Sequence, residues 1–147
     1  MNQEYLPIHE YLPHRGHMLL LERVLDIGEG HATCELTLRA DSSFCRDGRV
    51  PAYVGIEYMA QAGGVLIGAR ALAANTSPKI CYLVSVRKFS SHVDGFDVGT
   101  TLTVKAVETL RDDENGVGVM RCSIYHPADV LLVTAQLTAY MPKKLNT

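Results

Sequence analysis

The chain has 147 residues, of which 47% are hydrophobic, 20% charged and 7% aromatic. These values are typical of one folded domain over residues 1–147 and exclude a disordered chain. Lys and Arg number 14 against 16 Asp and Glu, a formal charge of −2. Since there is no basic block, we expect no nucleic-acid partner and no membrane partner. The start of the chain has no secretory signal and the four cysteines include no CxxC pair, so a cytoplasmic protein with reduced thiols is expected.

The predicted elements, in chain order, begin with a short helix over residues 8–12, which Pro13 ends. Residues 32–39 alternate between apolar and polar side chains, which is typical of a strand in an antiparallel sheet with one buried face. The other predicted strands span residues 18–27, 80–90, 101–110, 117–126 and 130–141. Polar residues 41–50 are expected to form a loop, and residues 94–95 and 97–99 to form turns.

One long helix is predicted over residues 51–74. Pro51 suits a first helical position, where no backbone N–H is needed, and residues 75–78 end the helix. Only Glu57 and Arg70 are charged between residues 52 and 74. These charges, together with Gln61 and four glycines, disfavour membrane insertion. A helix that is apolar on nearly all sides should therefore be surrounded by protein.

About six strands with one apolar face need a cover, and only one long helix is available to provide it. The sequence therefore predicts an α+β fold in which a curved antiparallel sheet wraps around one central helix, the arrangement called the hot-dog fold. Such an open sheet leaves an edge strand that pairing with another subunit would protect. We expect a dimer with a continuous sheet.

Glu57 is the first candidate for chemistry, in the second turn of the helix, with Gln61 one turn further on the same face. Burial of a carboxylate without partners is costly and favours its protonated form. A protonated carboxyl near neutral pH is what a general acid requires. The alternative is that Glu57 lies at the surface and only complements the helix dipole. Gln61 is expected to orient the site or to pack as a polar residue.

Three histidines are candidate bases. His14 and His17 flank Arg15 in a turn, and without a third ligand nearby we expect no metal. His92 either is oriented by Asp94 as a base or is a plain turn residue. The remaining histidines are expected at the surface: His9, His31 and His126. There is no G-x-S-x-G elbow and no phosphate-binding glycine loop.

Two segments carry a resemblance to a known family. Residues 12–15 (LPHR) and 18–24 (MLLLERV) resemble the opening of the beta-hydroxyacyl-(acyl carrier protein) dehydratases of fatty acid synthesis. Residues 50–64 (VPAYVGIEYMAQAGG) resemble the central-helix motif of these enzymes. The strand order is compatible over nearly the whole chain, and in detail it is similar to the dehydratase-like hot-dog proteins of aryl-polyene-type lipid pathways.

The resemblance implies an enzyme without a cofactor that removes water from a 3-hydroxyacyl thioester of acyl carrier protein or coenzyme A, giving a trans-2-enoyl thioester. It implies an acyl tunnel at the interface of a homodimer, a heterodimer with a paralogous dehydratase or a higher oligomer. A histidine of one subunit takes the proton alpha to the thioester, and the helix glutamate, here Glu57, handles the departing hydroxyl. Backbone N–H groups around Val54 and Gly55 would polarise the thioester carbonyl, with Gln61 beside the glutamate.

The chain departs from the family pattern just before the helix. The family carries its catalytic histidine in a Gly-His-Phe-Pro segment, whereas residues 43–49 here read SFCRDGR, and Ala52 replaces a glycine. Either His14, His17 or His92 supplies the base, or a different subunit supplies it. Otherwise the chain is a non-catalytic acyl-thioester-binding partner of an active dehydratase. A hot-dog acyl thioesterase, in which the helix carboxylate activates water, is a further alternative.

Overall fold

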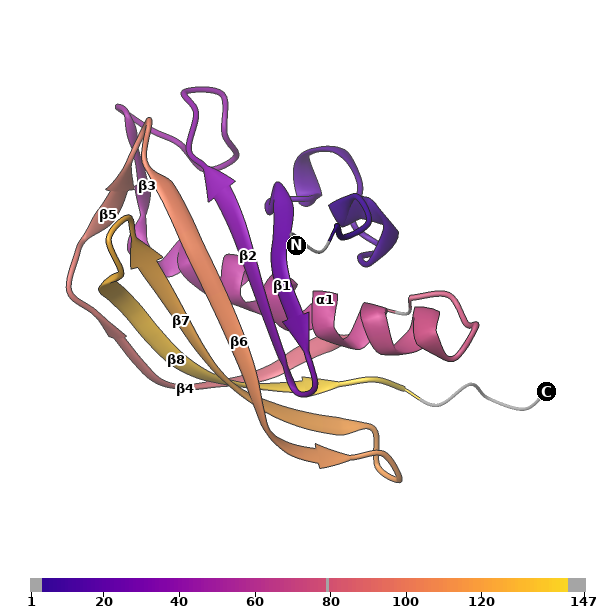
Figure 1. Cartoon of the computed structure of the whole chain (residues 1–147). Helices are drawn as coiled ribbons and strands as arrows, with labels where there is room; N and C mark the ends of the chain where they lie inside the picture. Colours follow the sequence, from indigo (N-terminus) through magenta and orange to yellow (C-terminus); the bar gives the residue numbers. More distant parts are fainter. Residues whose placement is uncertain (1–3, 79, 143–147) are drawn as a thin grey trace.

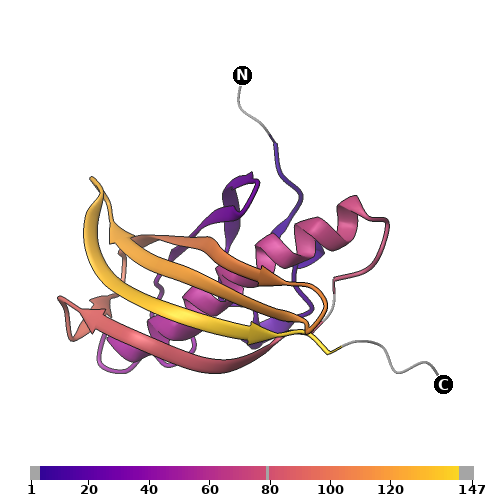
Figure 2. The ribbon, with the colours of Figure 1, turned by 90° about the horizontal axis from the view of Figure 1, so that it is seen from below.

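The computed structural model describes residues 4–78 and 80–142. Its long helix is α1 (Gly55–Ala73), and its six long strands are β1 (Arg23–Gly28), β2 (His31–Thr37), β4 (Tyr82–Ser91), β6 (Thr101–Asp112), β7 (Val117–His126) and β8 (Val130–Tyr140). These strands form one antiparallel sheet in the order β1-β2-β6-β7-β8-β4. The sheet curves around α1, as Figures 1 and 2 show. The predicted curved sheet around a single long helix is confirmed.

Five of the predicted strands lie within two residues of the observed ones. The exception is the first, predicted from residue 18 but observed only from Arg23. Residues 16–18 instead form a 3-10 turn, η2 (Gly16–Met18), in which Gly16 has a φ of 59°. The predicted short helix is likewise a single 3-10 turn, η1 (Ile8–Glu10).

The predicted helix start at Pro51 is wrong. Residues 49–51 form β3 (Arg49–Pro51), which pairs with β5 (Gly95–Asp97) where a loop and turns are predicted. Because Val50 pairs with Phe96 in this small sheet, Pro51 stays extended, with a ψ of 145°. A 3-10 turn, η3 (Ala52–Val54), then leads into α1.

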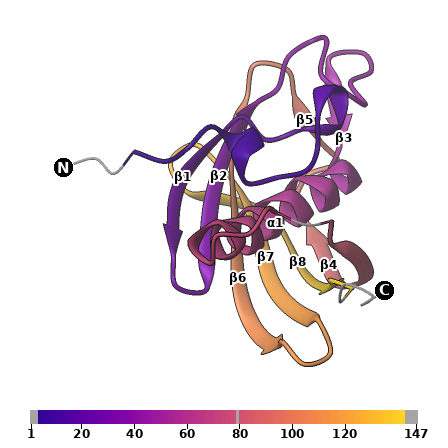
Figure 3. The ribbon, with the colours of Figure 1, turned by 90° about the vertical axis from the view of Figure 1, so that its right-hand side faces the viewer.

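The core lies between the inner face of the sheet and α1. On the inner face, alternate side chains of β2, β6 and β7 are buried, as their patterns predict. The N-terminal segment packs on another side of the helix (Figure 3). Gly68 permits this approach, since a Cβ there would lie 2.0 Å from the carbonyl oxygen of Tyr11.

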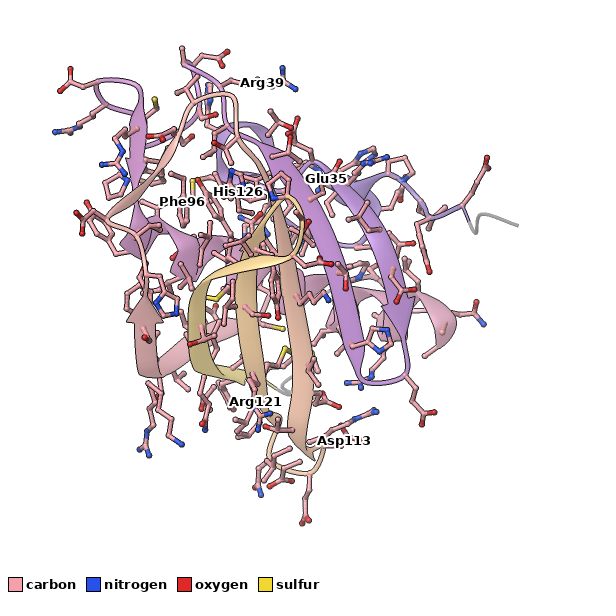
Figure 4. All side chains as sticks on the ribbon, turned by 60° about the vertical axis from the view of Figure 1, so that its left-hand side comes forward. Glu35, Arg39, Phe96, Asp113, Arg121 and His126 are labelled. Atoms are coloured by element: carbon pink, nitrogen blue, oxygen red, sulfur yellow. The ribbon has the colours of Figure 1, made fainter. Side chains whose placement is uncertain are left out.

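The outer face of the sheet is polar, in keeping with the alternation. Glu35 of β2 and Arg121 of β7 lie on this face (Figure 4), and Arg23 of β1 donates a hydrogen bond of 2.6 Å to Glu35. Figure 4 also shows Asp113 at the β6–β7 turn, at the opposite end of the sheet from Arg39. Among the described residues, no helix is long and apolar enough to cross a membrane.

The expectation that α1 is surrounded on all sides is wrong for the single chain. The face that carries Glu57, Ala60, Gly64 and Ile67 is exposed or only partly buried. On this side the sheet ends in β4, whose residues are exposed or partly buried along its whole length. The fold therefore leaves one face of its central helix open.

Candidate active site

A cavity of about 570 Å³ lies between the open face of α1, the N-terminal segment and the start of β4. Three of the residues singled out from the sequence line it, namely His14, Glu57 and Gln61. Most of the remaining wall is apolar, with side chains that come from the N-terminal segment, α1, the β4 region, β7 and β8: Leu12, Met18, Ile67, Ile80, Leu83, Met120 and Leu137. The fold thus brings a histidine and a carboxylate together beside an apolar chamber.

The helix itself makes room for the cavity. Ala60 and Gly64 follow Glu57 at helical spacing, and together with Gly63 they line the cavity without a long side chain. A Cβ on Gly64 would lie 2.8 Å from Leu12 Cδ2, and one on Gly63 would lie 2.6 Å from Met120 Sδ. Larger residues at either position would push into the walls of the cavity.

Gln61 holds the N-terminal segment against the helix. Its side-chain oxygen accepts hydrogen bonds from the N–H groups of Leu20 (2.9 Å) and Leu21 (3.4 Å), and its amide donates to the carbonyl of Met18 (2.7 Å). Gln61 is also the one polar side chain among the buried residues of the described chain, with 3% of its surface exposed. The Gln61 amide therefore binds the backbone of the segment that follows His14 and fixes this segment on the helix.

His14 lies half-buried in the wall of the cavity. Burial lowers its pKa below 6.5, the Glu57 carboxylate raises it and the Arg15 guanidinium lowers it further. The Nδ1 atom is buried and has no hydrogen-bond partner within the described residues. Arg15 is itself anchored, since it donates hydrogen bonds of 2.7 Å to the carbonyls of Leu12 and His14. The net effect favours a neutral imidazole, the form in which histidine accepts a proton.

Of the two positions considered for Glu57, buried or at the surface, the single chain shows the surface position. Its side chain is exposed, because neither the N-terminal segment nor β4 covers this face of α1. It nevertheless lines the cavity and interacts electrostatically with His14. Glu57 is therefore exposed to solvent on one side and faces the cavity that holds His14 on the other.

The other predicted site residues lie elsewhere. His17 lines a separate depression beside Tyr58, and His92 is exposed just beyond the end of β4. Val54 and Gly55 are buried and do not line the cavity as the described residues form it. The Gly55 N–H donates to carbonyls within the preceding 3-10 turn. The roles given to these four residues remain predictions.

Sequence reasoning missed a second, smaller cavity of about 210 Å³, toward the C-terminal end of α1. Arg70 donates two hydrogen bonds of 2.7 Å to Glu108 of β6 at its wall. The sequence does contain one signal for this site, because Arg70 is a charged residue on an otherwise apolar helix and such a residue needs a partner. Among the described residues, no group of three or more His, Cys, Asp or Glu is placed to hold a metal ion.

Comparison with solved structures of known proteins identifies the fold class of this chain. The chain is similar to a hypothetical thioesterase solved with coenzyme A from Streptococcus pneumoniae TIGR4 (12% identity, 83% of this chain and 86% of that one, TM-score 0.64). It is also similar to the E. coli PaaI protein from the phenylacetic acid degradation operon (13% identity, 80% and 81%, TM-score 0.62). At such identities the likeness concerns the fold alone, which is the predicted hot-dog fold.

The family follows from two stronger matches. The ApeP-like model, described as ApeP dehydratase, matches residues 6–147. A chain of the dehydratase heterocomplex ApeI:P from Xenorhabdus doucetiae shares 31% identity over 96% of this chain and 94% of that one, with a TM-score of 0.88. None of the curated proteins compared matches the chain. The chain belongs to the ApeP-like family and is a dehydratase or dehydratase-like subunit, which confirms the predicted resemblance.

Proposed function

We propose that this chain eliminates water from a 3-hydroxyacyl thioester, carried by acyl carrier protein or coenzyme A, to give the trans-2-enoyl thioester. The observation that supports this most strongly is that His14 and Glu57 line one cavity with apolar walls. The apolar part accommodates the acyl chain, and the two polar side chains lie where its thioester end enters. We further propose the cytoplasm as the compartment, which suits Cys34, Cys45 and Cys122, since none of these three forms a disulfide within the described residues.

The two side chains match the two needs of the reaction. Elimination requires a base at the acidified C2–H and an acid at the C3 hydroxyl, which is a poor leaving group. We assign the base to His14, because burial keeps its pKa below 6.5 and its imidazole neutral. We assign the acid to Glu57, at the mouth of the cavity. A proton thus leaves C2 for His14, the C2–C3 double bond forms, and the hydroxyl departs as water with the proton of Glu57.

The open side of the cavity calls for a second subunit. β4 is an edge strand with large exposed apolar side chains, at positions 82, 83, 84, 86 and 89. Such an edge is protected in proteins by pairing with another chain. Because the related structure is a dehydratase heterocomplex, we propose that a paralogous dehydratase subunit pairs along β4. This subunit would also cover Glu57 and exclude water from the cavity.

A second candidate function is that of a non-catalytic acyl-thioester-binding partner. It is favoured by the sequence of residues 43–49, which lacks the histidine of the related dehydratases. In that case the partner supplies both the base and the acid, and His14 only shapes the cavity wall.

The test is a dehydration assay on 3-hydroxyacyl thioesters with the chain alone and with its paralogue. We expect Glu57→Gln and His14→Gln each to lower the rate by a factor of about 10²–10⁴. His17→Gln and His92→Gln serve as matched controls, since both residues lie outside the cavity. A complex that keeps full activity with both cavity variants is a binding assembly in which this chain does no catalysis. Release of free thiol in place of enoyl product indicates a thioesterase.

A further inference from the structure

The two cavities beside α1 are neighbours that share three lining residues. Ile67, Cys81 and Ala139 line both the larger cavity, with His14 and Glu57, and the smaller one, with Arg70 and Glu108. We call the two cavities together the groove, and these three shared residues the constriction. The groove runs from the N-terminal half of α1 past the constriction to the C-terminal end of the helix.

The two ends of the groove differ in their charged side chains. The walls on both sides of the constriction are mostly apolar. Beyond it, the Arg70–Glu108 ion pair lies at the wall with 27% and 11% of the side chains exposed. Arg111 and Asp113, paired at 2.7 Å, line the same end, near the β6–β7 turn marked by Asp113 in Figure 4. An apolar chain that entered this end would displace water from charged groups and return no hydrogen bonds.

The length of the near part follows from the helix. Ile67 comes ten residues after Glu57, which corresponds to about 15 Å along the helix axis. An extended chain of single bonds advances about 1.2 Å per bond, as in an extended polypeptide. The near part therefore accommodates about twelve chain bonds between the reacting carbons and the constriction.

We propose that the constriction and the Arg70–Glu108 pair set an upper limit on the acyl chain. Apolar chains that extend up to about twelve bonds beyond C3 fit before the constriction, and longer ones are rejected at the charged end. The proposal names the substrate class within the dehydratase function and rests on it, because it takes the groove as the acyl site.

The test compares two chain lengths in the complex of this chain with its paralogue. Affinity for decanoyl and octadecanoyl coenzyme A is measured by calorimetry, and dehydration of the matching 3-hydroxyacyl thioesters is measured in parallel. We expect wild type to bind the octadecanoyl thioester at least about tenfold more weakly than the decanoyl thioester. Replacing the pair with Arg70→Met and Glu108→Met should reduce this ratio by about tenfold and leave decanoyl binding unchanged.

Controls separate this effect from general damage. Arg23→Met with Glu35→Met removes an ion pair on the outer face of the sheet and should leave the ratio unchanged. If the Arg70 and Glu108 double variant melts early, Ala139→Leu carries the test, because it narrows the constriction. It should weaken tetradecanoyl binding and spare hexanoyl binding, whereas Ala73→Leu, outside the groove, should change neither.

Two outcomes overturn the proposal: equal affinity of wild type for both thioesters, or a length preference that none of the groove variants alters. Failure of the dehydratase function is distinct from both. A complex that binds with the expected length limit but forms no enoyl product retains the groove assignment and loses the proposed reaction.

Discussion

Gln61→Leu tests how the N-terminal segment is held against the helix. The substitution keeps a side chain of similar size but removes the partner of the Leu20 and Leu21 N–H groups and of the Met18 carbonyl. A polar group left unpaired in the interior costs about 1–3 kcal/mol. Since the bond to Leu21 is long, two groups dominate, and we expect the free energy of unfolding to fall by about 3 kcal/mol.

Urea denaturation measures this loss. The midpoint should fall with an unchanged m-value, and the melting temperature should fall by about 6–12 °C for a chain of this size. Gln136→Leu is the matched control, because Gln136 is only partly buried on the outer face of β8, and it should change stability by less than about 0.5 kcal/mol. A loss below about 1 kcal/mol for Gln61→Leu would refute the view that this amide fastens the segment.

Three further predictions concern the close packing, the edge strand and the imidazole. Gly68→Ala should lower the free energy of unfolding by about 1–3 kcal/mol, because its Cβ would meet the Tyr11 backbone; unchanged melting would contradict that packing. Val84→Lys should abolish association through β4 in gel filtration while stability changes by less than about 0.5 kcal/mol; an unaltered complex would place the partner elsewhere. Because the folded pKa of His14 lies below the unfolded value of 6.5, the unfolded chain binds the proton first, and stability falls as the pH drops below that value. His14→Gln should make this fall shallower in urea titrations from neutral to acidic pH, and an identical slope would show that His14 does not titrate in this way.

Much of the fold could be predicted because the sequence carries its signals locally. Residues 32–39 alternate cleanly, and β2 has the expected inner and outer faces. The start of α1 could not be predicted in this way. Pro51 fits a helix start on local grounds, but the pairing of Val50 with Phe96, distant in the sequence, keeps it extended.

In the candidate site, too, local sequence predicts some features, whereas others depend on contacts between distant parts of the chain. Glu57 and Gln61 follow from helical spacing, which places them on one face. His14 could not be ranked above His17 and His92, since only the packing of the N-terminal segment on α1 puts one imidazole in the cavity. The choice between a buried and an exposed Glu57 stayed open, because a helix that is apolar on nearly all sides does not reveal which face its own sheet leaves uncovered.

A double-substitution cycle tests the central claim, that His14 and Glu57 act together on one substrate, most directly. Dehydration rates of the complex are compared for wild type, His14→Gln, Glu57→Gln and the variant with both changes. Groups that serve the same step lose activity non-additively, so the double variant should be about as slow as the slower single variant. Losses that multiply, or an inert His14→Gln, would contradict a shared role for the two side chains.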